Sequence, residues 1–202
     1  MLSDRVRRLR EDGDETVEEE SFQGETLTGL DLWGIEFTGV TFTKCRFVDC
    51  RLGGGFFGRV RLEGCDLSNC AFGDGSWRDC TLVDCKGLGA DFRSSHWRGC
   101  TLTGCQLRMA NFSRTLWDGC TWRDCDLGQS LWMECKLNRV TAGGCDMTGV
   151  NLFRTPLKGL DLSTCRIEGI TVSESLSELK GLTVGAHQTV DLVKLLGVKV
   201  EG

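Results

Sequence analysis

The cysteines of this 202-residue chain repeat with a period that neither an ordinary helix nor an ordinary strand produces: all 13 occupy positions that are multiples of five. Large apolar residues recur two positions later in the same frame. Of the 31 positions in steps of five from Phe22 to Val172, 29 hold Leu, Phe, Trp, Met, Ile or Val, and only Gly87 and Ala142 depart. A face that repeats every 3.6 or every 2 residues loses phase with a period of five within a few repeats. The backbone must therefore turn a corner at each repeat.

Each repeat has two inward positions, a small residue and then a large one, which indicates a short extended segment followed by a bend. The segments CDLSN, ADFRS, ANFSR and CDLGQ share an order of small residue, polar residue, Leu or Phe, and two more mostly polar residues. This order resembles the pentapeptide-repeat family, and the resemblance spans roughly residues 20 to 174 without a break. It implies an all-β fold, a right-handed quadrilateral β-helix of about eight coils in which residues 20 apart in sequence stack on one another.

Sorted into coils of 20 residues, the expected interior forms ladders of matched volume, as a narrow close-packed core requires. One ladder is built of cysteine alone: Cys45, Cys65, Cys85, Cys105, Cys125, Cys145 and Cys165. In a second ladder each large residue is preceded, two positions earlier, by a small one. The large residues are Phe57, Trp77, Trp97, Trp117 and Leu137, and their small partners, in the same order, are Gly55, Gly75, Ser95, Thr115 and Cys135. Gly87 and Ala142 leave gaps in this scheme, and Leu88 beside Gly87 suggests a local distortion.

The two ends depart from the repeat and are expected to cap it, because open sheet edges aggregate. We therefore expect three parts: an N-terminal segment over residues 1–20, a repeat domain over 21–173, and a C-terminal module over 174–202. In the first segment Leu2, Val6 and Leu9 share a helical face, and an acidic run follows. This indicates a capping helix and a solvated linker, with a partner-binding tail as the alternative.

The C-terminal module has apolar residues at helical spacing and Gly197 as a stop, so a short helical cap is expected, followed by a strand over residues 198–200. The ending resembles that of the topoisomerase-protecting members of the family, the quinolone-resistance (Qnr-type) and microcin B17 immunity proteins. The resemblance implies that this segment also joins two rods tail to tail as a homodimer. A monomeric end cap is the alternative. The candidate dimerisation residues are Val190, Val193, Leu195, Leu196 and Val198.

No catalytic, metal or cofactor site is expected. Zinc sites usually combine C-x2-4-C turns with further Cys or His ligands, whereas these cysteine doublets are C-x4-C on straight ladders. We expect reduced thiols that act as small hydrophobic side chains. Neither His96 nor His187 has a nucleophile and an orienting carboxylate at recognisable spacing, and there is no phosphate-binding or dinucleotide fingerprint. The chain is therefore not expected to be an enzyme or to take a small-molecule substrate.

The charge pattern bears on the partner. Resemblance to the Qnr type implies a rod that imitates DNA at the binding saddle of DNA gyrase or topoisomerase IV, which calls for dense negative charge, about one every 1.7 Å in duplex DNA. Residues 21–173 hold 17 acidic and 17 basic residues, so the net charge of −5 comes mainly from the N-terminal segment. The face with the tryptophans is basic. The candidate partner-binding acidic residues lie on two other faces: Asp31, Asp49, Asp66, Asp74, Asp91, Asp126, Glu134 and Asp146.

Ordinary solubilising charge is the alternative interpretation of these acidic positions. An apolar patch of Leu131, Met133 and Phe153, with Trp33 further along the same face, suggests a contact surface. Direct nucleic-acid binding is not expected, because the net charge is negative and the aromatic residues fall at interior positions. No segment is long and apolar enough to span a bilayer, and the N-terminus lacks the apolar core of a signal peptide, so we expect a cytoplasmic protein.

Together these features favour a non-catalytic protein that binds DNA gyrase or topoisomerase IV as a DNA mimic and protects it from an antibiotic or a toxin. The alternative is a structural or scaffolding rod with an unrelated protein partner.

Overall fold

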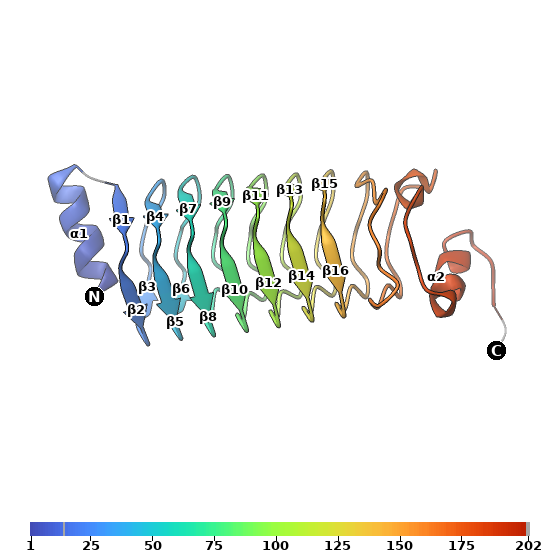
Figure 1. The fold of residues 1–202 in the computed structure, drawn as a ribbon, viewed down its shortest axis with the longest axis horizontal. Coiled ribbons are helices and arrows are strands. Elements are labelled where there is room, and N and C mark those ends of the chain that lie inside the picture. The colour runs from blue at the N-terminus through green and yellow to red at the C-terminus, as the bar shows by residue number, and fades with distance from the viewer. Residues whose placement is uncertain (14, 201–202) are drawn as a thin grey trace.

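The protein is an elongated rod of stacked coils with a helix at each end (Figure 1). The structure is a computed structural model that describes residues 1–13 and 15–200, without the side chains of residues 9, 10 and 12. Helix α1 (Leu2–Asp12) lies at the N-terminal end, and α2 (Thr189–Lys194) lies at the C-terminal end. Two single 3-10 turns precede α2, η1 (Ser177–Leu179) and η2 (Ala186–Gln188).

All strands are three residues long and pair in parallel with the strand 20 residues away, as Thr16 pairs with Glu36. The first face of the rod is a seven-stranded sheet of β1 (Thr16–Glu18), β4 (Glu36–Thr38), β7 (Phe56–Gly58), β9 (Ser76–Arg78), β11 (His96–Arg98), β13 (Leu116–Asp118) and β15 (Lys136–Asn138). The second face is a seven-stranded sheet of β2 (Ser21–Gln23), β5 (Thr41–Thr43), β8 (Arg61–Glu63), β10 (Thr81–Val83), β12 (Thr101–Thr103), β14 (Thr121–Arg123) and β16 (Thr141–Gly143).

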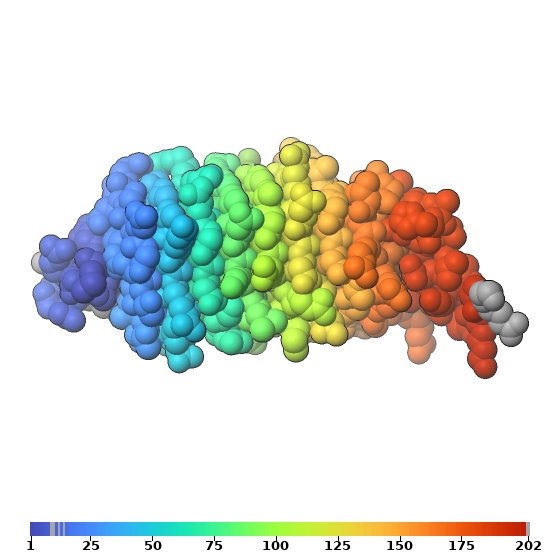
Figure 2. Space-filling model, turned by 90° about the horizontal axis from the view of Figure 1, so that it is seen from below, coloured from blue at the N-terminus to red at the C-terminus, as the bar shows by residue number. Residues whose placement is uncertain are grey.

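The third face begins with β3 (Thr26–Thr28) and β6 (Arg46–Val48) and continues through isolated bridges such as Asp66 with Lys86. The fourth face is held by isolated bridges alone, from Asp31 with Arg51 onwards. The predicted quadrilateral β-helix with a short C-terminal helix is thus confirmed. The two long sheets have seven strands each, slightly fewer than the eight coils expected, because the last rungs are bridged or turned without a full strand. Figure 2 shows the coils as closely packed bands around the rod.

The corners explain the glycine pattern. Thirty residues stand two positions after a central residue between 24 and 169, and 29 of them have a positive φ; the exception is Thr164. Glycine reaches this left-handed region without strain, and Asn and Asp do so more readily than most other residues. The less suited residues that occupy corners, such as Met109 at φ 57°, therefore store conformational strain.

The interior contains continuous aromatic stacks. Phe57 stacks on Trp77 at 4.0 Å between ring centroids, Trp77 on Trp97 at 4.5 Å, and Trp97 on Trp117 at 4.7 Å. The indole N–H of Trp97 donates to Ser95 Oγ at 2.8 Å. The indole N–H of Trp117 donates to the Thr115 hydroxyl, also at 2.8 Å. Where the small partner is Ser or Thr, it therefore supplies a hydrogen-bond acceptor as well as space.

The expected distortion at Gly87 is absent. Its N–H donates to the Gln106 carbonyl at 2.8 Å, as in neighbouring rungs, and Leu88 simply points outward with 49% of its surface exposed. Leu107 of the next coil fills the gap, because its Cδ2 lies 2.6 Å from the place a Cβ on Gly87 would take. Ala142 follows Trp122 directly in the sheet register and is only partly buried.

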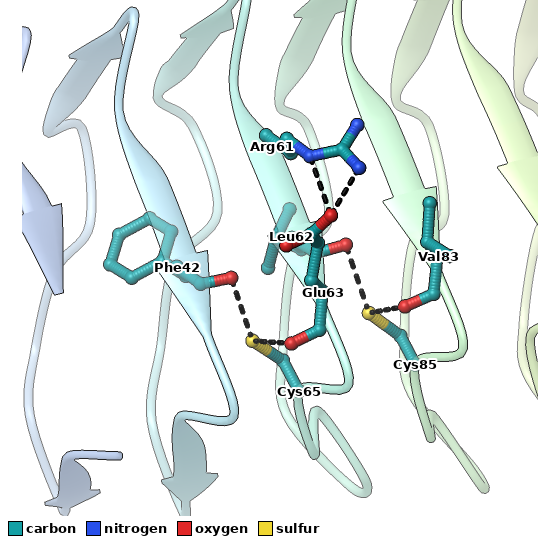
Figure 3. Close-up of polar contacts among 7 residues, drawn as sticks. All are labelled: Phe42, Arg61, Leu62, Glu63, Cys65, Val83 and Cys85. Carbon is teal, nitrogen blue, oxygen red and sulfur yellow. Dashed lines mark hydrogen bonds and ion pairs between the residues drawn. The ribbon is translucent and has the colours of Figure 1, made fainter. Parts of the chain in front are cut away.

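The thiols lie inside the rod, where all 13 are buried and free. Figure 3 shows how they are held: Cys65 Sγ donates to the Phe42 carbonyl of the preceding coil at 3.3 Å, and Cys85 Sγ to the Leu62 carbonyl at 3.5 Å. Burial raises the pKa of the Cys70 thiol to about 11. The cysteines therefore serve as small interior residues that also bind backbone carbonyls.

Helix α1 covers the N-terminal end of the rod. Leu2 and Val6 are buried against the first coil, while the side chain of Leu9 lies outside the described part of the structure. The backbone N–H of Leu2 donates to Glu25 Oε2 at 2.8 Å. Because β1 already pairs with β4, the coil begins at Thr16, one repeat before the expected boundary at residue 21.

The C-terminal module closes the other end. The buried Gln188 side chain donates to the carbonyls of Leu162 and Cys165 at 2.9 and 2.6 Å, which caps two carbonyls of the last coil. Gly197, at φ 75°, follows the short helix as expected. The strand expected over residues 198–200 is wrong: these residues have no regular structure and pair with no described strand. Alternating valines alone do not make a strand where no sheet edge is within reach.

Candidate partner-binding surfaces

Most of the predicted acidic residues are neutralised by arginine. Six of the eight form ion pairs: Asp31 with Arg51 (3.3 Å), Asp66 with Arg46 (3.7 Å), Asp126 with Arg108 (3.4 Å), Glu134 with Arg154 (3.5 Å), Asp146 with Arg166 (3.8 Å), and Asp91 with Arg93. Four of these pairs join residues 20 apart, because stacked coils bring equivalent outward positions within about 4.8 Å. Asp49 and Asp74 occupy corners and have no ion pair within the described chain.

Several of the same aspartates have a structural role that the sequence did not reveal. Asp66 Oδ1 accepts the N–H of Ser68 at 3.1 Å, and Asp146 Oδ1 accepts the N–H of Thr148 at 2.9 Å. Partial burial works to raise the pKa of Asp66, but the hydrogen bonds from Ser68 and the nearby Arg46 outweigh it and lower the pKa. Such side-chain turns favour aspartate at the second position of a repeat whatever the partner is.

The basic residues of the first face are less completely paired. Arg139 makes hydrogen bonds to both carboxylate oxygens of Asp118, at 2.7 Å each, and Arg59 pairs with Glu19 at 3.1 Å. Arg98 and Lys136 have no ion pair within the described chain. This face is therefore positively charged towards the C-terminal half of the rod.

The predicted apolar patch lies on the fourth face. Phe153 exposes 36% of its surface, and Leu131 and Met133 are half-buried. The Arg154 guanidinium lies over the Phe153 ring, 4.9 Å from its centroid. Trp33 is far along the same face and lies over Gly53 and Gly54, so it does not extend the patch.

Helix α2 lies at the C-terminal end of the rod (Figure 1), and the predicted dimerisation residues belong to it and to the segment that follows it. Val190, Leu196 and Val198 expose 41%, 64% and 48% of their surface, whereas Val193 and Leu195 are half-buried. Leu195 packs against the hydrophobic core of the rod, whereas Val190, Leu196 and Val198 leave apolar surface exposed among the described residues.

The described residues contain no group of three or more His, Cys, Asp or Glu side chains placed to hold a metal ion. No described helix is long and apolar enough to cross a membrane. His96 is exposed on β11, and His187 is exposed on η2.

The family follows from the register of the rod and from one comparison. Residues 56–128 match the model of the pentapeptide repeat region, and the same 20-residue register continues on both sides of that stretch. Residues 56–128 belong to the pentapeptide-repeat family, and the rod as a whole has the pentapeptide-repeat fold. No curated protein sequence matches it significantly.

Solved structures share the pentapeptide-repeat fold. A trypsin-treated variant of QnrB1, described as a plasmid-mediated fluoroquinolone resistance protein, superposes with a TM-score of 0.56 and 20% identity over 92% of this chain and 97% of that one. HetL, a pentapeptide-repeat protein involved in heterocyst differentiation regulation from the cyanobacterium Nostoc sp. strain PCC 7120, gives 0.47 and 15% identity over 89% and 91%. At these identities the likeness to QnrB1 establishes the fold alone, and the weaker one to HetL adds nothing to it.

Proposed function

We propose that this pentapeptide-repeat protein binds DNA gyrase or topoisomerase IV and protects it from an antibiotic or a toxin. The observation that carries the proposal is the rod itself: its fold matches that of a fluoroquinolone resistance protein over nearly the whole length of both chains. Protection would come from occupying the enzyme's DNA-binding saddle, a step that makes and breaks no covalent bond. The protein would act in the cytoplasm, where its target is.

The charges limit how far the rod can imitate DNA. Arginine neutralises six of the eight acidic residues proposed for the contact, and the repeat body carries equal numbers of acidic and basic residues. Asp49 and Asp74 are the members of that set without an ion pair among the described residues. Complementary shape, these two carboxylates and the acidic N-terminal segment would therefore supply the recognition.

The C-terminal module would join two rods as a homodimer. Val190, Leu196 and Val198 present apolar surface at the end of the rod, and no residue that the structure describes covers it. Burying such surface against a second copy is favourable, at about 25 cal/mol per Å². Residues 174–202 would then form the dimerisation module, and the coils from Thr16 to residue 173 would form the binding rod, with α1 as its N-terminal cap.

A gyrase supercoiling assay tests the proposal. The purified full-length protein is added with and without a quinolone, and with and without a peptide toxin. We expect supercoiling to recover in the presence of the inhibitor as the protein is added. Absence of any effect on gyrase and on topoisomerase IV, with or without inhibitor, would refute the proposal.

A matched pair of variants connects the assay to the surface. Asp49→Asn with Asp74→Asn removes the two unpaired carboxylates, whereas Asp66→Asn with Asp146→Asn removes two that arginine already neutralises. We expect the first double variant to lose more protection than the second. Equal effects would mean that the unpaired carboxylates are not part of the contact.

A scaffolding rod for an unrelated protein is the second candidate function. The arginine pairing of the acidic residues favours it, because a neutral surface does not require a positively charged partner. An affinity purification that recovers another partner and no topoisomerase subunit would select it.

A further inference from the structure

The stacking of the coils is interrupted near the C-terminal end of the rod, on two of its four faces. The interruption, which we call the seam, lies between residues 136–143 and residues 156–163. β15 and β16 are the last strands of the two long sheets (Figure 1), and no described strand pair or isolated bridge joins them to the next coil. The third and fourth faces continue past the seam through isolated bridges, for example Asn151 with Thr171.

Backbone hydrogen bonds are missing across the seam at the end of the first face. At the preceding coil the Gly119 N–H donates to the Asn138 carbonyl at 3.0 Å, and the equivalent bond recurs every 20 residues back to Glu19. Its continuation, from the Arg139 N–H to the Lys158 carbonyl, is absent among the described residues. The regular ladder therefore stops at this corner.

The second face shows the same loss. The Thr141 N–H donates to the Cys120 carbonyl at 2.9 Å, as in the coils before it, but the Asp161 N–H makes no such bond to the Val140 carbonyl. On the first face Pro156 contributes to the break, because proline has no N–H to donate to a ladder. Two neighbouring faces thus lose their backbone connection at the same level of the rod.

Inward side chains at the seam are less well covered than their equivalents one coil earlier. Trp117 and Trp122 are each 1% exposed. Leu137 and Ala142, which follow them in the same ladders, are only partly buried. The loss of hydrogen bonds is therefore accompanied by a loss of apolar packing between the two coils.

A hollow of about 50 Å³ lies at the corner of the seam. Leu137 and Val140 line it from one coil, and Leu157 and Leu160 line it from the next. This volume admits water but is far too small for a peptide strand. The seam in this structure is therefore a weak contact between two coils and not a docking groove.

Beyond the seam the chain forms a block with its own connections. The Leu157 N–H donates to the Glu178 carbonyl and the Leu162 N–H to the Thr183 carbonyl, both at 2.9 Å. The Gln188 side chain binds two carbonyls of the same coil. These bonds do not cross the seam, so they survive if the seam opens.

The intact faces define the edge about which opening can occur. On the third face the Arg166 N–H donates to the Cys145 carbonyl at 2.9 Å, and on the fourth face the Thr171 N–H donates to the Val150 carbonyl at 2.9 Å. We propose that the seam is a hinge: the block after it opens away from β15 and β16 while the third and fourth faces stay closed.

Such an opening requires less free energy than global unfolding, because few backbone hydrogen bonds and few apolar contacts are broken. The hinge does not rest on the proposed function. If the C-terminal module joins two rods, however, the hinge lies between that module and the body of each rod. Opening would then change the angle between the two rods without unfolding either of them.

Thiol labelling of the full-length protein under native conditions tests the hinge. Leu160→Cys places a thiol on the far side of the seam, where Leu160 is 4% exposed. Val60→Cys is the matched control: Val60 is 1% exposed at the same position of a coil whose neighbour is bonded, since the Thr81 N–H donates to the Val60 carbonyl at 2.9 Å. The labelled residue is identified by peptide mass spectrometry. We expect Leu160→Cys to react more than about tenfold faster, because it needs only the seam to open.

Urea identifies the kind of opening. Labelling through the hinge should depend weakly on urea, since little surface is exposed, whereas labelling of Val60→Cys should follow the slope of global unfolding. Pro156→Ala, added to Leu160→Cys, restores an N–H at the position from which Lys136, one coil earlier, donates to the Thr115 carbonyl at 3.0 Å. It should slow labelling about fivefold, the effect of one backbone hydrogen bond.

Three results would overturn the proposal: equal labelling rates for the two cysteines, a urea slope for Leu160→Cys equal to that of global unfolding, or labelling that Pro156→Ala does not slow. The experiment contains no topoisomerase, so its failure is distinct from a failure of the supercoiling assay.

Discussion

The tryptophan ladder makes a prediction about one glycine. Three interior indoles donate to a hydroxyl two residues earlier, at 2.8 Å in each case: Trp97 to Ser95, Trp117 to Thr115, and Trp132 to Ser130. Trp77 has Gly75 at the equivalent position, and its indole N–H has no hydrogen-bond partner within the described structure. Gly75→Ser should supply the missing acceptor.

The expected gain is about 1 kcal/mol in the free energy of unfolding. Leaving a buried donor unsatisfied costs about 1 to 3 kcal/mol. Part of that is offset because a Cβ on Gly75 would lie 3.2 Å from the Phe72 carbonyl oxygen, which must move slightly. A Cβ there would also lie 3.5 Å from the Trp77 indole nitrogen, so the hydroxyl would be within reach. For a chain of this size the gain corresponds to a rise in Tm of about 2 to 4 °C.

Urea denaturation and thermal unfolding measure the gain, with two controls. Gly75→Ala adds the Cβ without the hydroxyl, so the difference between Ser and Ala isolates the hydrogen bond. Gly55→Ser lies one coil earlier, beside Phe57, which has no N–H to satisfy; its Cβ would lie 2.2 Å from the Ile35 carbonyl oxygen and should destabilise. If Gly75→Ser is no more stable than Gly75→Ala, the hydrogen-bond reasoning is refuted.

Three further predictions concern the corners, the thiols and the C-terminal module. Met109→Gly should raise the free energy of unfolding, measured by urea denaturation, by about 1 kcal/mol, because glycine adopts the positive φ of this corner without strain. Thr164→Gly is the control: this corner has no positive φ, so the substitution should give no gain. Burial raises the pKa of Cys70 to about 11, so above about pH 8.5 the folded protein keeps a proton on this thiol that the unfolded chain releases. The contribution of this thiol to the free energy of unfolding therefore falls as the pH rises above that value. Tm measured from pH 7 to 10 should decrease, and a flat profile would contradict this. Leu196→Asp places a charge on the most exposed of the proposed dimer residues and should convert a dimer to a monomer in sedimentation analysis; an unchanged sedimentation coefficient would argue against the interface.

Much of the fold could be predicted from sequence because the constraint repeats. In this repeat, a residue five positions from an inward residue also points inward. The 29 apolar positions in register therefore predict the coil, the interior ladders and the buried thiols from sequence alone. The ends were harder to predict. The valines at 198 and 200 suggested a strand, but strand formation depends on a neighbouring edge, which sequence pattern does not encode.

The candidate site shows the limit more clearly. Sequence pattern predicts partner-binding surface at Asp66 and Asp146, the second residues of their repeats. Both instead accept backbone N–H groups within their own turns and pair with arginines one coil away. The 20-residue spacing of these charges was present in the sequence and could have revealed the pairs. The seam could not be predicted, because the apolar repeat continues across it at Leu157 and Leu162 while the backbone hydrogen bonds stop.

The central claim, that this rod occupies the DNA-binding surface of a type II topoisomerase, is tested most directly by competition. Gyrase is first bound to a fluorescently labelled DNA duplex, and the full-length protein is then added while the fluorescence anisotropy is followed. We expect the anisotropy to fall to the value of free DNA as the rod displaces the duplex, and the Asp49→Asn, Asp74→Asn double variant to need a higher concentration to do so. An anisotropy that stays constant under a large excess of the rod would mean that the rod does not occupy the DNA-binding surface.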